Sequence, residues 1–382
     1  MLQNLVNNIN DEYKYDTEIL QALILIRSEN VGPKTFKHLI DLFKDPKTAI
    51  EAVPELAARA GKRKINLATI EQAEKEISKI NKYGARLIYY KDSNYPDLLR
   101  NIHDFPPIIS VKGNFNLLNE PCFSIVGSRN SSQNGFNIAK KFAENLANKN
   151  WNIVSGMARG IDYAAHLGSL EKGTIAVLGG GIDNIYPSEH ETLYHKITEK
   201  GCIVAEMPIG TVPLPKHFPL RNRIISGLSY GTMVAEASLK SGSLITAKCA
   251  IEQDREVFAI PGFPLDPRCQ GPNWLIKQGA HLVENIDDII EIIEPLKQRN
   301  LNLNDNEKGF ININFKKLPS DKETNIVRNK ILSLLSYSPT HIDEIIKSVD
   351  AEISLIYLSL LELELAGLIK RSSNDTITLV AS

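Results

Sequence analysis

The chain reads CFSIVGSR over residues 122–129, NIVSGMARGID over 152–162 and TIAVLGGGID over 174–183. In each stretch, apolar residues typical of a buried strand run into a glycine-rich turn, and helical sequence follows. Such turns lie at the carboxyl ends of strands in an open parallel sheet, which is where these folds bind ligands. Backbone N–H groups freed by glycine, together with helix N-termini, make that edge of the sheet suited to phosphate.

Strand-like and helical segments alternate from residue 122 to about residue 295. The strands are expected at 122–127, 152–155, 174–178, 202–205, 231–235 and 256–260. This alternation predicts an α/β fold with an extended Rossmann-like, doubly wound parallel sheet.

The flanking sequence predicts further domains. Helical periodicity favours an all-α N-terminal domain over 1–82. The α/β core is expected over 84–296, with one short strand at 86–90 and proline-marked loops before residue 122. Polar residues 297–321 are typical of a linker. The tail, 322–382, has three helical segments and then a possible hairpin, which is the pattern of a winged-helix domain.

Bulk properties exclude several classes of protein. The formal net charge is −1, so any affinity for nucleic acid has to come from a local patch. The four cysteines are far apart and form no C-x-x-C pair, as expected of reduced side chains. The first residues lack the pattern of a signal peptide, and no early apolar run is long enough to span a bilayer. We therefore expect a cytoplasmic protein with no membrane contact.

Motifs of common cofactor and metal chemistry are incomplete. The first turn has Gly127 but no G-x-G-x-x-G, which argues against ordinary dinucleotide binding. Residues 168–173 have the spacing of a Walker A loop, but Thr174 stands where a lysine is required. His190 and His195 are five residues apart, and only an i, i+4 pair shares one helix face as a zinc site needs.

Two acids also follow glycine turns, Asp162 and Asp183. They suit a metal ion or a ribose, but acids in such places more often cap helices or brace loops, and we favour this second interpretation. The sequence therefore predicts no cofactor, no metal and no catalytic residue.

Cationic side chains stand among the strand-end turns. Arg129 directly follows Gly127-Ser128, and its planar guanidinium matches phosphate oxygens. The alternative is a surface arginine that pairs with an acid. A fourth turn, SGSLITA at 241–247, opens another helix; Ser241, Gly242 and Ser243 offer an anion seat, flanked by Lys240.

The segment 211–227 combines prolines, cations and an aromatic ring. Its prolines stiffen an extended loop, Lys216, Arg221 and Arg223 supply positive charge, and Phe218 can stack on a base. A cationic track with an interleaved aromatic residue suits single-stranded nucleic acid. The alternative is that Phe218 belongs to the core and that Arg221 pairs with an acid such as Glu206.

Six ordered motifs over residues 122–283 resemble the DNA-processing protein family of natural transformation, called DprA or Smf. They are Ile125–Arg129, Ser155–Asp162, Gly179–Asp183 with Tyr186-Pro187, Phe218–Arg223, Glu236-Ala237 with Ser241–Ala247, and Ile260–Gly262. The resemblance implies a core that binds single-stranded DNA, dimerises, protects incoming DNA and helps to load the RecA recombinase, without catalysis.

Carried over residue by residue, this resemblance implies a set of DNA-contacting positions. The carried-over positions are Arg129, Lys216, Phe218, Arg221, Arg223 and the turn of Ser241, Gly242 and Ser243. Their neighbours Gly127, Ser128, Asn222 and Lys240 complete the predicted DNA-binding set. Residues 17–61 resemble the family's N-terminal domain, of helix-hairpin-helix or sterile-alpha-motif type. The hairpin departs from its pattern, because Asn30 stands where a first glycine is expected and Pro33 follows Gly32, which argues against DNA contact there.

Two other functions remain possible from the sequence. The core also resembles nucleotide phosphoribohydrolases of the lysine-decarboxylase-like group, whose site includes a P-G-G-x-G-T-x-x-E turn. Residues 231–236 match only the last part of that turn, and Ser229-Tyr230 replaces the glycine pair before it. A purely structural scaffold leaves the many strand-end glycines and cations unexplained.

The expected recognition helix of the tail, residues 351–367, carries no lysine or arginine. It has three acids instead, Glu352, Glu362 and Glu364, which would repel phosphate. We therefore predict that this domain contacts protein or packs on the core, and that deleting 322–382 leaves single-strand affinity nearly intact.

Overall fold

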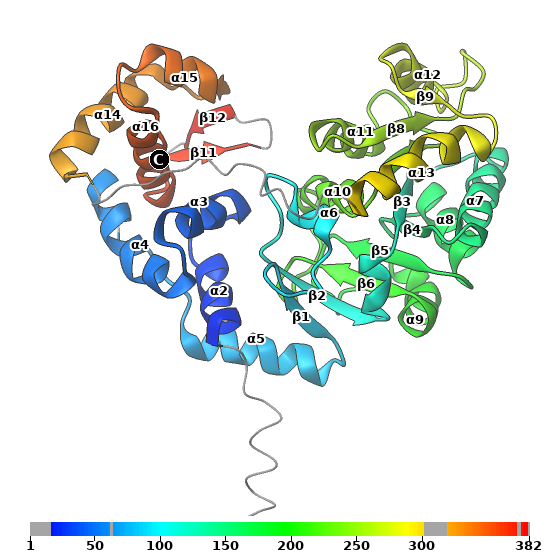
Figure 1. Cartoon of the computed structure of the whole chain (residues 1–382), viewed down its shortest axis with the longest axis horizontal. Helices are drawn as coiled ribbons and strands as arrows, with labels where there is room; N and C mark the ends of the chain where they lie inside the picture. Colours follow the sequence, from blue (N-terminus) through cyan, green and yellow to red (C-terminus); the bar gives the residue numbers. More distant parts are fainter. Residues whose placement is uncertain (1–16, 62–63, 302–318, 373–375, 381–382) are drawn as a thin grey trace, which may run out of the picture. The chain divides into compact units, whose positions relative to one another are not determined.

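A computed structural model describes residues 17–61, 64–301, 319–372 and 376–380 (Figure 1). The chain divides into two compact units, residues 1–75 with 307–382 and residues 76–306. The first unit therefore combines segments from both ends of the chain. In the described residues no helix is long and apolar enough to cross a membrane.

A mixed sheet forms the centre of the second unit. Its nine described strands are β1 (Arg86–Tyr89), β2 (Ile108–Gly113), β3 (Cys122–Val126), β4 (Asn152–Ser155), β5 (Thr174–Leu178), β6 (Cys202–Ala205), β7 (Gly231–Val234), β8 (Glu256–Ala259) and β9 (His281–Leu282). They lie in the order β1-β2-β6-β5-β4-β3-β7-β8-β9, parallel from β6 to β9. The six strands expected from residue 122 onward are confirmed to within one residue.

The expectation of loops before residue 122 missed β2. This strand is antiparallel to both β1 and β6 and extends the parallel sheet at one edge. The prolines at 106 and 107 directly precede its first residue. They therefore mark the entrance to a strand, a position where proline is tolerated, rather than a break in the sheet.

Helices cover both faces of the sheet. One face carries α6 (Asp97–Arg100), α10 (His217–Gly227), α11 (Ser243–Glu252) and α12 (Gln270–Lys277); the other carries α7 (Gln133–Asn148), α8 (Ile161–Ser169), α9 (Glu191–Lys200) and α13 (Asp287–Leu301). Successive residues of a strand point alternately into the hydrophobic cores on the two faces of the sheet. In β3, for example, Val126 packs toward α10 and α11, whereas Ile125 packs toward α7 and α8.

The strand order reverses at β3. From this strand the chain continues to β4, β5 and β6 on one side, and later returns to β7, β8 and β9 on the other. The carboxyl ends of β3 and β7 therefore diverge into separate connections, and open α/β sheets bind ligands in the crevice at such a point. The turn at 127–129 and the segment that leads to residues 241–243 both emerge here.

The first unit is a helical domain joined to a winged helix. It contains α2 (Thr17–Arg27), α3 (Pro33–Phe43), α4 (Pro46–Ala60) and the start of α5 (Ile70–Lys82), then α14 (Asp321–Leu334), α15 (Ile342–Ser348) and α16 (Ile353–Leu365). Strands β10 (Thr340–His341), β11 (Ile369–Arg371) and β12 (Thr376–Leu379) form its small sheet. The predicted winged helix is confirmed.

The linker expected over 297–321 is only partly described. Residues 297–301 continue helix α13, residues 302–318 lie outside the described part of the chain, and α14 begins at Asp321. Helix α16 packs against α3 and α4 of the N-terminal domain. The sequence predicted that the winged-helix domain contacts protein or packs on the core, but it did not identify the N-terminal domain as the partner.

Candidate nucleic-acid interface

A cleft of about 520 Å³ opens at the reversal point of the sheet. Its walls come from the turn after β3, the beginning of α10 and the turn before α11. Nine residues predicted for the site line it: Gly127, Ser128, Arg129, Phe218, Arg221, Asn222, Ser241, Gly242 and Ser243. The volume is within the range of ordinary ligand sites.

The turn after β3 is fixed by close backbone contacts. A Cβ on Gly127 would lie 2.5 Å from Cγ1 of Ile161, so only glycine lets β3 pass this close to α8. The Ser128 N–H donates to the Glu236 carbonyl at 2.6 Å. The carboxylate of the same Glu236 accepts from the Ser132 N–H at 2.8 Å. The end of β7 therefore holds the loop that carries Arg129.

Arg129 and two aromatic rings form one side of the cleft. The exposed Arg129 guanidinium lies 5.2 Å from the centroid of the Phe218 ring, within the range of a cation–π contact. The Tyr186 ring lies 5.3 Å from that of Phe218, and Tyr186 is 47% exposed. Among the described residues, no carboxylate pairs with Arg129. Its charge is therefore available to an anion.

Arg221 lies deeper in the same cleft. Its buried guanidinium donates to the carbonyls of Gly156, at 2.7 Å, and of Val177. A Cβ on Gly156 would lie 2.7 Å from Nη2 of Arg221, so this glycine makes room for the charge. Burial lowers the pKa of Arg221 to about 10; Asp162 opposes this effect and Arg129 adds to it. Because the two guanidinium groups repel each other, an anion between them would be stabilised.

The turn before α11 supplies polar groups to the same cleft. Asn222 donates from Nδ2 to the Gly242 carbonyl at 3.1 Å and so ties this turn to α10. The hydroxyls of Ser241 and Ser243 lie 2.7 Å apart at the start of α11. Hydroxyls beside a helix N-terminus make a suitable phosphate seat.

Three predicted residues do not line the cleft. Arg223 is buried; its guanidinium contacts Glu206 at 2.5 Å and Asp104 at 3.5 Å, so it is better explained as a structural ion pair. The acid contact of Glu206 is thus made by Arg223 and not by Arg221. Lys216 and Lys240 are exposed neighbours of the lining residues, on the rim rather than in the wall.

The acids near the crevice hold loops in place. Asp162 is buried, and its carboxylate accepts from the N–H groups of Gly156 at 3.2 Å and Ala158 at 3.4 Å. Asp183 accepts from the Gly210 N–H at 2.7 Å. Both contacts agree with the bracing role favoured from the sequence. Within the described ranges there is no group of three or more histidine, cysteine or acidic residues that suits a metal ion.

Comparison with known proteins assigns the chain to a family. The model of the DNA recombination-mediator protein A family matches residues 86–294, which is more than half of the chain. The chain belongs to this family. A DprA-like N-terminal HHH domain matches residues 16–78, and a DprA winged-helix domain matches residues 316–374. These matches settle the helix-hairpin-helix type of the first domain.

Relatives in the family come from diverse bacteria. Protein Smf of Escherichia coli is 40% identical over 278 residues, 72% of each chain, and the DNA processing protein DprA of Bacillus subtilis is 42% identical over 57% of this chain and 73% of its own. The X-ray structure of DprA from Streptococcus pneumoniae matches with a TM-score of 0.56 at 37% identity, over 65% of this chain and 83% of that one. DNA processing protein A from Helicobacter pylori, whose structure was described for its single-stranded DNA binding mode, matches with a TM-score of 0.50 at 29% identity, over 56% and 96%.

Sequence reasoning missed several lining residues in this family member. Tyr186, Asn130 and Thr246 are among them. Tyr186 belongs to one of the family motifs, but the sequence indicates no role for its side chain. The position of Tyr186 beside Phe218 becomes apparent only when the connection after β5 and the start of α10 are folded together.

Proposed function

We propose that this protein binds single-stranded DNA in the cleft at the reversal point of the sheet. The observation that carries the proposal is the convergence of Arg129, the Phe218 ring and the Ser241–Ser243 turn on one cavity. A guanidinium for phosphate, a ring for a base and a polar anion seat are the elements that single-strand binding requires. Lys216 and Lys240 at the rim would extend the cationic track along the DNA backbone.

The proposed role is binding without catalysis. Apart from the arginines and the phenol of Tyr186, the only ionisable side chain among the described residues that line the cleft is that of Asp162. Its carboxylate is buried and accepts hydrogen bonds from the backbone, so it is poorly placed to move protons to or from a ligand. Incubation with nucleoside monophosphates should therefore release no free base; release that depends on Arg129 would support the hydrolase alternative.

We further propose that the bound DNA is protected and passed to the RecA recombinase in the cytoplasm, and that the protein acts as a dimer. Family membership supports this extension. The lag before RecA hydrolyses ATP on single-stranded DNA measures filament nucleation, and substoichiometric protein should shorten this lag. An unchanged lag, with DNA binding intact, would contradict loading while leaving the proposed site standing.

The binding experiment compares single-stranded and duplex oligonucleotides of one length by fluorescence anisotropy. We expect tighter binding of the single strand and an affinity that falls as salt rises, because phosphate contacts release counterions. Equal affinity for both forms would contradict a site in which exposed bases stack.

A further inference from the structure

Two elements of the first unit that commonly contact DNA face each other in this chain. They are the hairpin loop between α2 and α3, residues 28–32, and α16, the recognition helix of the winged helix. Asn30 of the loop donates from Nδ2 to the Leu365 carbonyl of α16 at 3.0 Å, and beside this contact Lys34 of α3 donates from Nζ to the carbonyl of Ser372, which follows β11, at 3.3 Å. The His38 and Tyr357 rings meet edge to face at 6.1 Å.

The residue that departs from the hairpin pattern takes part in this contact. Asn30 has φ +60°, a left-handed conformation that asparagine tolerates better than most residues. Its amide supplies the donor to α16 that a glycine lacks. Asn30 in place of the expected glycine therefore makes the hairpin less suited to DNA and gives it a hydrogen bond to the winged helix.

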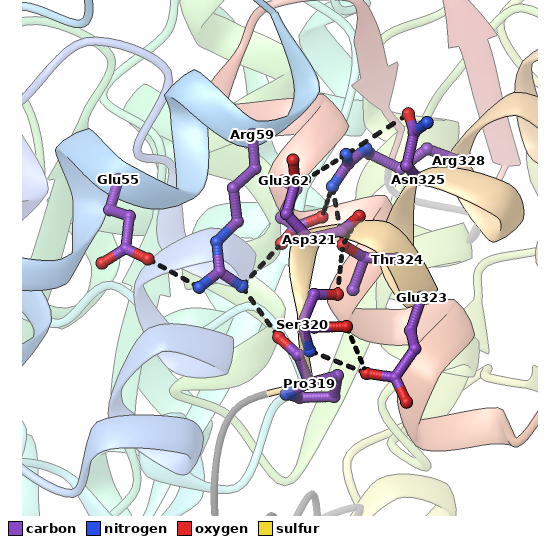
Figure 2. Close-up of polar contacts among 10 residues, drawn as sticks. All are labelled: Glu55, Arg59, Pro319, Ser320, Asp321, Glu323, Thr324, Asn325, Arg328 and Glu362. Atoms are coloured by element: carbon purple, nitrogen blue, oxygen red, sulfur yellow. Dashed lines mark hydrogen bonds and ion pairs between the residues drawn. The ribbon is translucent and has the colours of Figure 1, made fainter.

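A buried ionic cluster joins the same two domains (Figure 2). Glu362 of α16 is 0% exposed and lies between Arg328 of α14, to which it is hydrogen-bonded, and Arg59 of α4, whose Nη1 is 3.7 Å from Oε1 of Glu362. Nη1 of Arg59 also donates to the Pro319 carbonyl at 3.1 Å. A carboxylate at this depth is strongly unfavourable unless cations remain beside it.

Helix α16 has little surface left for nucleic acid. It carries no lysine or arginine, and eight of its residues, from Ile356 to Leu365, are buried. Helices that read a major groove present polar and basic residues to the bases and phosphates. A helix that is apolar on most sides is instead suited to a packed interior.

We propose that the hairpin loop and α16 of one chain are each other's ligands, so that neither reads duplex DNA. Arg59 favours this pairing because its positive charge compensates the buried carboxylate of Glu362. The winged helix is thus a docking surface for the protein's own N-terminal domain. This inference does not depend on the proposed single-strand site, which lies entirely in the second unit.

A disulfide across the interface tests the pairing in the full-length chain. A Cβ on Gly61 would lie 3.5 Å from Cβ of Ala366, within disulfide range, and Gly61 has an extended backbone that cysteine accepts. The double variant Gly61→Cys/Ala366→Cys should form an intrachain disulfide on mild oxidation, identified by mass spectrometry of unreduced peptides. The control pair Glu51→Cys/Ala366→Cys moves one cysteine about 15 Å along α4 and should not link.

The oxidised double variant then reports on DNA. We expect its affinities for single-stranded and duplex oligonucleotides to equal those of the reduced form. Absence of the disulfide, or a covalent dimer in its place, would overturn the intrachain pairing. A loss of duplex affinity that a reductant restores would show that the domains have to separate to bind DNA, and would also overturn the proposal.

A second measurement tests the selecting role of Arg59. Adding Arg59→Met to the cysteine pair should slow disulfide formation about tenfold, because the buried Glu362 loses one of its two cations. Glu55→Gln is the matched control, since it removes only the exposed partner of Arg59 and should leave the rate unchanged. Equal rates with and without Arg59 would refute the selecting role.

Discussion

The Arg129 guanidinium lies over the Phe218 ring at 5.2 Å, although the two residues are far apart in the chain. Arg129 follows β3, and Phe218 belongs to the first turn of α10. This contact places a positive charge and a stacking surface side by side at the mouth of the cleft. One nucleotide offers a phosphate and a base at a similar spacing, which suits single-stranded DNA better than an isolated anion.

Replacing Phe218 by leucine should weaken single-strand binding while the fold is kept. The ring contributes stacking, which amounts to about 1–3 kcal/mol per base, and leucine preserves much of the apolar contact with the turn at Gly179. Anisotropy on a normal and an abasic oligonucleotide separates the loss of base stacking from a change in the packing of the side chain. The difference between wild type and variant should disappear on the abasic strand. If it persists there, Phe218 contributes through packing alone.

Gly242 gives a test of the anion seat that does not disturb the fold. It has an ordinary φ of −62°, and a Cβ added there meets nothing within 4 Å, so the structure itself does not require a glycine. Gly242→Ala should keep wild-type stability in chemical denaturation and yet lose single-strand affinity, because a methyl group would occupy the space of the phosphate. The control is Gly32→Ala in the first unit, which is equally open. Unchanged affinity in Gly242→Ala would remove this turn from the site.

Arg223 should behave as a structural residue. Arg223→Met leaves Glu206 and Asp104 without their buried cation, and we expect the free energy of unfolding to fall by about 3–5 kcal/mol. Urea denaturation measures this loss, and the folded fraction should bind single strands as wild type does. Arg159→Met, which breaks an exposed ion pair with Glu189, should leave the free energy of unfolding nearly unchanged. If the Arg223→Met protein is stable but binds DNA poorly, Arg223 contacts the DNA, as the sequence predicted.

His166 should make the stability of the protein depend on pH. Burial lowers its pKa to about 3, so it is neutral in the fold but becomes protonated in the unfolded chain below about pH 6.5. Lowering the pH from 6.5 toward 3 therefore favours unfolding, by up to about 1.4 kcal/mol per pH unit. His166→Gln should flatten this dependence, and the exposed His195→Gln should not. Equal slopes in wild type and His166→Gln would contradict the buried neutral state.

The sequence was sufficient to predict the six strands between residues 122 and 260 and the sheet edge at which the cleft opens. The six strands from residue 122 alternate with helices, and glycine turns end three of them, so the parallel order and the edge where ligands bind follow from general rules. The antiparallel strand β2 was not predicted, because the prolines before it are read as loop signals. Its pairing with β6 depends on contacts between residues far apart in the chain.

The roles of individual arginines could not be predicted from sequence alone. Arg221 and Arg223 are two positions apart on α10, yet one lines the cleft and the other is buried against Glu206 and Asp104. Only the fold decides which of them meets an acid, because Asp104 is distant in sequence. The docking of α16 on the N-terminal domain was likewise hidden, since its acids indicated only that DNA was an unsuitable partner.

Anisotropy of a labelled single-stranded oligonucleotide over a salt series, with wild type beside Arg129→Ala and Arg159→Ala, tests whether the cleft binds DNA. Arg129 points into the cleft without a carboxylate partner among the described residues, whereas Arg159 is an exposed arginine paired with Glu189. We predict that Arg129→Ala loses about tenfold or more in affinity, while Arg159→Ala matches wild type. The slope of log affinity against log salt concentration should become shallower in Arg129→Ala, by the amount expected for the loss of about one phosphate contact. Equal affinity and slope in wild type and Arg129→Ala would show that the DNA binds outside this cleft.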